Sequence, residues 1–189
     1  MEEDEHGSYI MNSKDLRAIE HIKRLLEIGI DSFKIEGRTK SIYYVSRVVQ
    51  AYRQAIDDAK NGAEFNPKLL SSLENLANRG YTDGFFQRHS VKEYQNYLDG
   101  NSHNRKQIYV AEIEAYDHQN KMINLLTKNK ICLGDKLEVI LPNNNVEFIV
   151  DKIFDMNNKP MTEVPGGSFR VKIPFAEPNV EFGLVARNL

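Results

Sequence analysis

Residues 30–38 read Ile-Asp-Ser-Phe-Lys-Ile-Glu-Gly-Arg, and this stretch decides how the first half of the chain is interpreted. β-Forming residues between two glycines predict one strand over residues 30–35. Apolar residues at helical spacing predict helices over residues 13–29, 41–60 and 66–80. A lone buried strand leaves its backbone groups unpaired. The pattern helix–strand–helix–helix therefore indicates the end of a βα-barrel-like domain whose earlier strands lie upstream, and the alternatives are an unusual small α+β domain or strands supplied by a second chain.

The second half of the chain has a different sequence pattern. Short β-rich segments alternate with polar turn clusters, a pattern typical of a small antiparallel β-barrel of about six strands. The segments are residues 107–116, 121–128, 136–141, 146–154, 168–174 and 182–187. The predicted fold class is α+β, with a truncated C-terminal end of a βα catalytic barrel domain in residues 1–100 and a C-terminal β-barrel domain in residues 101–189.

Composition excludes several classes of protein. The 189 residues carry 25 Lys and Arg against 27 Asp and Glu, and 41% of them are hydrophobic, which is unlike a disordered chain. There is no apolar run of the roughly 20 residues that a membrane helix needs, and the acidic start is unlike a signal peptide. A single cysteine cannot form an internal disulfide, so we expect a cytoplasmic protein. The net charge of −2 argues against coating nucleic acid by charge alone.

The residues after the predicted strand are the strongest local candidates for a site. In βα-repeat folds the chemistry lies at the carboxyl ends of strands, where Glu36 and Arg38 would stand. Arg38 could hold a carboxylate or phosphate through two hydrogen bonds, and Glu36 could orient it or accept a hydrogen bond. The alternative is a structural Glu36–Arg38 pair that closes the end of the barrel.

Other chemistry-bearing groups are weaker candidates. The acidic residues 2–5 with His6 could form a metal or acid–base site, but a solvated acidic loop is the more frequent outcome. The remaining histidines lack ligand spacing, so no metal is expected, and Cys132 is interpreted as a buried structural thiol. Two basic zones with interleaved aromatic residues lie within residues 34–47 and 79–106. They could bind phosphates and stack on unpaired bases, or could form a salt-bridged helix surface.

Several longer motifs carry a resemblance to a known family. Residues 3–16, 32–41, 52–57 and 79–85 resemble, in the right order, the collagenase-like peptidase family U32. The resemblance implies a full-length protein with a barrel-like βα catalytic domain and a C-terminal β-barrel. The family's iron–sulfur cysteines would lie upstream, so no cofactor is expected in this chain. The matched motifs supply the candidate substrate-binding residues Asn12, Ser13, Lys34, Arg38 and Lys40, while the catalytic residues stay unknown beyond the candidates Glu36 and Arg38.

The resemblance also implies a function. Within the family, the chain is similar to enzymes that install 5-hydroxyuridine at the wobble position of tRNA, with prephenate as a co-substrate of the full-length enzyme. We therefore expect the C-terminal portion of a tRNA-modification enzyme, inactive alone, whose barrel positions the anticodon region of tRNA. The alternatives are a peptidase, as the family name suggests, and a non-catalytic binding module. No membrane partner is expected, and the sequence predicts no oligomeric state.

Overall fold

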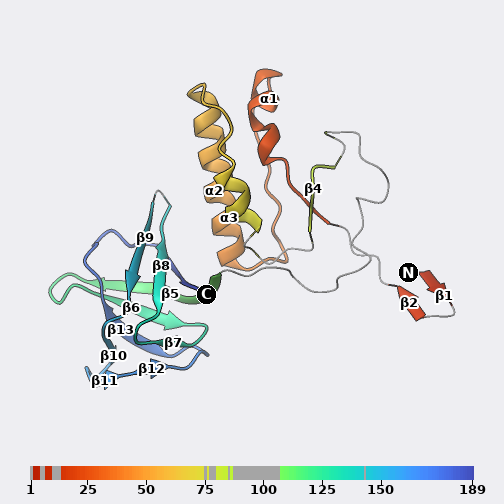
Figure 1. Ribbon diagram of the computed structural model, residues 1–189. Helices are drawn as coiled ribbons and strands as arrows, with labels where there is room; N and C mark the ends of the chain where they lie inside the picture. The colour runs from red at the N-terminus through yellow and green to blue at the C-terminus, as the bar shows by residue number, and fades with distance from the viewer. Residues whose placement is uncertain are drawn as a thin grey trace. The chain divides into compact units, whose positions relative to one another are not determined.

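The structure is a computed structural model of the chain, and it divides into two compact units, Met1–Arg105 and Lys106–Leu189 (Figure 1). It describes residues 14–74, 76, 80–84, 86, 107–142 and 144–189, together with the backbone of residues 2–4 and 7–9. Helices dominate the described part of the first unit, and a large antiparallel sheet forms the second. The protein is therefore of mixed helix and sheet class.

The longest helix in the described part of the first unit is α2, Ile42–Lys60. Its N-cap is Ser41, whose side-chain oxygen accepts a hydrogen bond from the backbone N–H of Tyr44 at 3.2 Å, satisfying one of the donors that a helix start leaves free. Val48, Ala51 and Ala55 lie buried along one face, as the helical periodicity predicted. The helix predicted over residues 41–60 is confirmed.

Shorter elements surround α2. The helix predicted over residues 66–80 is found as α3, Lys68–Glu74, and the helix predicted over residues 13–29 is found in shorter form. The latter consists of a 3-10 turn, η1 (Ile19–His21), followed by α1 (Ile22–Glu27). It begins late because β3 (Asp15–Leu16) pairs in parallel with β4 (Tyr81–Thr82) and holds the preceding residues extended. Two further strands, β1 (Glu2–Asp4) and β2 (Gly7–Tyr9), form an antiparallel pair.

The strand predicted over residues 30–35 is wrong. Within the described part of the chain these residues form no ladder, and the side chains of Ile30 and Ile35 are 39% and 37% exposed. The backbone N–H of Ile30 instead donates to the carbonyl of Leu25 at 3.0 Å, which ends the helix before it. β-Forming residues make a strand only where a neighbour supplies ladder hydrogen bonds, and no described strand lies against this segment.

The second unit is built on an eight-stranded antiparallel sheet in the order β11-β10-β13-β6-β5-β14-β8-β9. A separate antiparallel pair joins β7 to β12. The bounds are β5 Gln107–Asp117, β6 Met122–Thr127, β7 Ile131–Cys132, β8 Lys136–Ile140, β9 Asn145–Ile149, β10 Ile153–Asp155, β11 Pro160–Met161, β12 Glu163–Val164, β13 Arg170–Pro174 and β14 Leu184–Asn188.

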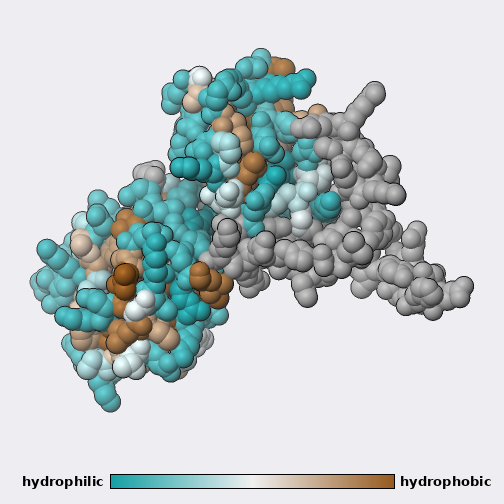
Figure 2. All heavy atoms as spheres, viewed as in Figure 1, coloured by the Kyte–Doolittle hydropathy of each residue, from teal (hydrophilic) through white to brown (hydrophobic). Residues whose placement is uncertain are grey.

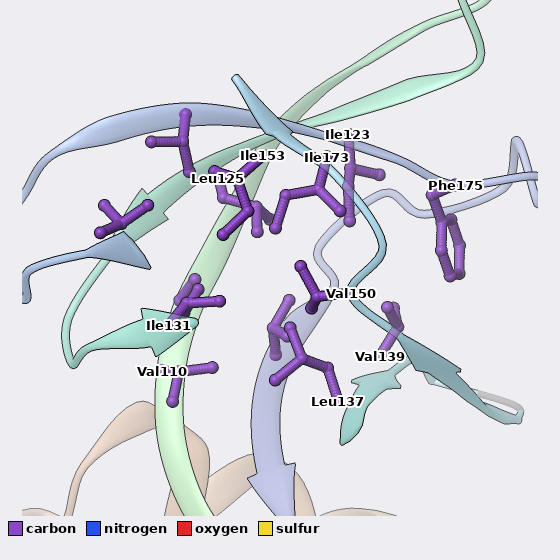
Figure 3. Packing of buried hydrophobic residues seen from close by; sticks show 14 of the residues in the cluster. Val110, Ile123, Leu125, Ile131, Leu137, Val139, Val150, Ile153, Ile173 and Phe175 are labelled. Carbon is purple, nitrogen blue, oxygen red and sulfur yellow. The ribbon is translucent and has the colours of Figure 1, made fainter. Parts of the chain in front are cut away.

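The core of the second unit follows from alternation along its strands. In β6, Ile123, Leu125 and Thr127 are buried while the residues between them are partly exposed, the pattern of a sheet with one face on the core. Figure 3 shows side chains from β5, β6, β8, β10 and β13 converging on one another in a single hydrophobic cluster. Val110, Leu137 and Ile173 in this cluster have no exposed surface.

One strand prediction in this unit needs correction. Residues 146–154 were predicted as a single strand but form parts of β9 and β10. The pairing of β9 ends before Val150, which bonds to a different segment. Its carbonyl accepts from the N–H of Gly134 at 2.8 Å, and its N–H donates to the carbonyl of Asp135 at 3.0 Å. The main sheet exceeds the predicted six strands because β10 and β11 are only two or three residues long, which is too short for a periodic signal.

No helix in the described residues is both long and apolar enough to cross a bilayer. Figure 2 shows a mostly hydrophilic surface over the described atoms, with hydrophobic residues gathered in small patches.

Candidate functional site

The turn after residues 30–35 holds several of the predicted site residues. Gly37 accepts a hydrogen bond from the N–H of Lys40 at 2.9 Å, and a Cβ on Gly37 would lie 3.0 Å from Val45 Cγ2, so glycine lets the turn pack against α2. Lys34 Nζ lies 3.4 Å from Glu36 Oε2, and both side chains are mostly exposed. Arg38 is exposed in the same turn. Glu36 thus contacts Lys34, and the turn presents the Arg38 guanidinium to solvent.

A cavity of about 430 Å³ in the first unit brings some of these residues together. Lys34, Glu36 and Lys40 line it, and Arg38 does not. Asn12 and Ser13 lie outside the described residues. Apolar walls and polar groups share the lining, which comprises Asp15, Leu16, Arg17, Ala18, Ile22, Ser32, Phe33, Lys34, Ile35, Glu36, Lys40, Tyr44, Val48, Tyr52, Leu73 and Tyr81. Such a mixture is typical of small-ligand sites.

An ion pair stands at one wall of this cavity. Lys40 Nζ lies 2.7 Å from Asp15 Oδ2, and the two side chains are 25% and 21% exposed. The ammonium also lies 4.6 Å from the centroid of the Tyr44 ring, within cation–π range, and Tyr44 Oη lies 3.4 Å from Asp15 Oδ2. Asp15 is held in place because its own N–H donates to the carbonyl of Gly80 at 2.9 Å.

Two further tyrosines line the cavity. Tyr52 Oη accepts from the N–H of Ala18 at 2.9 Å, and Tyr81 Oη donates to the carbonyl of Leu73 at 2.9 Å. Burial is the largest cause that raises the pKa of Tyr44, Tyr52 and Tyr81, and for Tyr44 and Tyr81 the Asp15 carboxylate adds to it. These phenols therefore stay protonated at neutral pH, so they act as hydrogen-bond donors and acceptors and not as bases.

The groups that line the cavity are better suited to binding a ligand than to catalysing a reaction. The Asp15 carboxylate and the Lys40 ammonium compensate each other, and protonated phenols and the exposed Lys34 and Glu36 line the same cavity. This arrangement suits a compact ligand with both apolar surface and charged groups.

The sequence interpretation missed Asp15 and Tyr52 as site residues, whereas it considered Tyr44 and Tyr81 among the aromatic residues interleaved with the basic zones. Tyr44, Val48 and Tyr52 are spaced four residues apart, which places them on one face of α2, and the spacing itself predicts only an apolar core stripe. Nothing local marks Asp15, because the β3–β4 pairing that positions it joins segments more than sixty residues apart.

The chain does not fit an iron–sulfur cluster. Such clusters are held by cysteine thiolates, commonly four, and this sequence contains only Cys132. In the described residues no group of three or more His, Cys, Asp and Glu side chains is placed to hold a metal ion.

Comparison with known proteins identifies the family. Residues 1–96 match the family described as Peptidase family U32, and residues 105–187 match the Peptidase family U32 C-terminal domain. The chain belongs to peptidase family U32.

Relatives within that family are longer than this chain. The chain is 43% identical over 188 residues to tRNA hydroxylation protein P of Haemophilus influenzae and 44% identical over 187 residues to the protein of the same name from Escherichia coli. These matches cover 99% and 98% of this chain but 41% of each relative. Among solved structures, the C-terminal domain of a Geobacillus thermoleovorans U32 protein matches 43% of this chain and 92% of its own length, with 17% identity and a TM-score of 0.41.

Proposed function

We propose that this chain is the C-terminal part of a cytoplasmic enzyme that hydroxylates tRNA, forming 5-hydroxyuridine at the wobble position. The observation that carries the proposal is the identity of 43% and 44%, over nearly the whole chain, to proteins named for tRNA hydroxylation. Because the chain spans 41% of the length of these relatives, the activity belongs to the whole protein. The description of the whole family names a peptidase, and this gives the alternative activity.

The two units take different roles in this proposal. The first is the end of the catalytic domain, where the cavity and the adjoining turn face substrate. Asn12, Ser13, Lys34, Arg38 and Lys40 contact substrate, and Glu36 and Arg38 are the catalytic candidates. The exposed guanidinium of Arg38 supports its role in substrate binding. A planar guanidinium can donate two parallel hydrogen bonds to a tRNA phosphate or to a dicarboxylate such as prephenate. The second unit closes into a small β-barrel and positions the anticodon region.

A genetic experiment tests the proposal. Mass spectrometry of tRNA from a strain lacking the full-length gene should show loss of 5-hydroxyuridine, and the intact gene should restore it. A gene truncated before residue 105 should restore less, because tRNA binding weakens, and that binding should fall steeply with salt. Unchanged 5-hydroxyuridine in the deletion strain, with gelatin cleavage by the purified full-length enzyme, would favour the peptidase instead.

A further inference from the structure

A second cavity, of about 440 Å³, lies on the C-terminal unit. The end of β5 and the loop before β14 line it, through Ile113, Glu114, Ala115, Tyr116, His118, Pro178, Val180, Glu181 and Phe182. Its volume is within the range of small-ligand pockets, and three of its lining side chains are aromatic rings.

Phe182 is the least expected member of this cavity. Its side chain is 87% exposed, and its backbone has a φ of +60°, in the left-handed region that bulky residues rarely adopt. The turn is fixed because Gly183 N–H donates to the carbonyl of Val180 at 3.0 Å, and a Cβ on Gly183 would lie 2.7 Å from Ile113 Cδ1. Because the Phe182 ring is exposed, its burial does not stabilise the fold enough to offset the strained backbone. Such backbone strain is concentrated at ligand sites.

The other two rings are held in place by their neighbours. Tyr116 Oη donates to the carbonyl of Phe175 at 3.0 Å, and the Tyr116 ring meets the His118 ring edge to face with centroids 4.9 Å apart. The turn that carries His118 is fixed by Asp117, whose carboxylate accepts from the backbone N–H groups of Gln119 and Asn120. The cavity therefore presents aromatic faces in set orientations.

The carboxylates of the cavity differ in what they can still bind. Both oxygens of Glu114 are taken by Arg170, at 2.8 and 2.9 Å. Among the described residues no side chain pairs with Glu181. A carboxylate only accepts hydrogen bonds, so Glu181 selects a ligand that presents N–H donors.

We propose that this cavity binds one unpaired nucleobase bearing an exocyclic amino group, stacked on Phe182 with its amino group toward Glu181. The inference rests on the proposed RNA substrate and names the part of the RNA that the second unit recognises. Lys121 lies in the turn that carries His118 and supplies a basic side chain for the RNA backbone. A cavity built for a basic peptide would leave both carboxylates free, whereas Arg170 already occupies Glu114.

Binding of short fluorescent RNAs to the full 189-residue chain tests the inference. We expect an oligouridine with one central adenosine or cytidine to bind several-fold more tightly than oligouridine alone, by fluorescence anisotropy. Phe182→Ala should weaken binding of that RNA about tenfold, the usual effect of losing one stacking ring. Glu181→Gln should remove the preference over oligouridine, because an amide both donates and accepts. The matched control is Phe169→Ala, which removes a ring that is 52% exposed and outside the cavity, and should leave binding unchanged.

Other outcomes would overturn the inference in distinguishable ways. If the chain binds RNA and Phe182→Ala binds as wild type does, the nucleobase site is refuted while the proposed function stands. If an arginine-rich peptide binds in a Phe182-dependent manner and RNA does not compete, the cavity is a peptide site. If no RNA binds the chain, the inference fails, and the tRNA mass spectrometry still decides the function.

Discussion

Replacing Lys40 by methionine tests whether the Asp15–Lys40 pair organises the first cavity. The two charges are 2.7 Å apart, which corresponds to about 1.5 kcal/mol of attraction at a dielectric constant of about 80 and about 6 kcal/mol at about 20. Because each side chain keeps a fifth to a quarter of its surface exposed, and ion pairs lose much of this attraction to desolvation, we expect a net loss of about 2 kcal/mol. Methionine is unbranched and only one heavy atom shorter than lysine, so the change removes the ammonium and its contacts while it keeps most of the apolar side chain.

The measurement is urea unfolding followed by circular dichroism at a helical wavelength, because the helices of the described residues lie in the first unit. Lys34→Met is the matched control, since Lys34 pairs with Glu36 at 3.4 Å while 87% exposed and its loss should cost less than about 0.5 kcal/mol. Asp15→Asn combined with Lys40→Met should recover part of the loss, because no unpaired carboxylate remains. Equal effects of Lys40→Met and Lys34→Met would refute the argument.

Three other predictions concern the second unit and the turn. Gly166→Ala should destabilise the second unit by about 2 kcal/mol in urea unfolding, because the new Cβ would lie 2.7 Å from the carbonyl oxygen of Lys128. Hydrogen bonding to Arg170 lowers the pKa of Glu114, so its contribution is present above the unfolded pKa of about 4.3 and is lost as the pH falls toward the folded value. Acid titration of Arg170→Gln should accordingly show a shallower loss of stability below about pH 5 than wild type, and equal slopes would contradict this. Arg38→Lys in the full-length enzyme should strongly reduce 5-hydroxyuridine without changing the melting temperature, and full activity would remove Arg38 from the site.

Features set by local chemistry could be predicted from the sequence. α2 was predictable because its apolar stripe runs for five turns and its N-cap Ser41 acts on the adjacent turn. The strands β6 and β13 were predictable for the same reason, since alternation along each strand reflects the one buried face.

Features set by distant partners could not be predicted. Residues 30–35 have the composition of a strand, but composition does not supply the neighbour whose hydrogen bonds would make one. The same limit applies to the cavity, where Asp15 reaches Lys40 only because β3 pairs with β4. Phe182 was likewise read as part of a strand, and the turn that gives it a positive φ depends on contacts with Val180 and Ile113.

The strand order of the second unit has a consequence for its synthesis. β14 follows the seven other strands of the sheet in sequence, yet it lies between β5 and β8 and joins the half containing β6 and β13 to the half containing β8 and β9. The sheet therefore cannot be completed during translation of the preceding residues, and its nascent halves expose unpaired strand edges until β14 arrives. Deletion of Leu184–Asn188 would remove the strand that joins the two halves of the sheet, leaving the edges of β5 and β8 unpaired and open to aggregation.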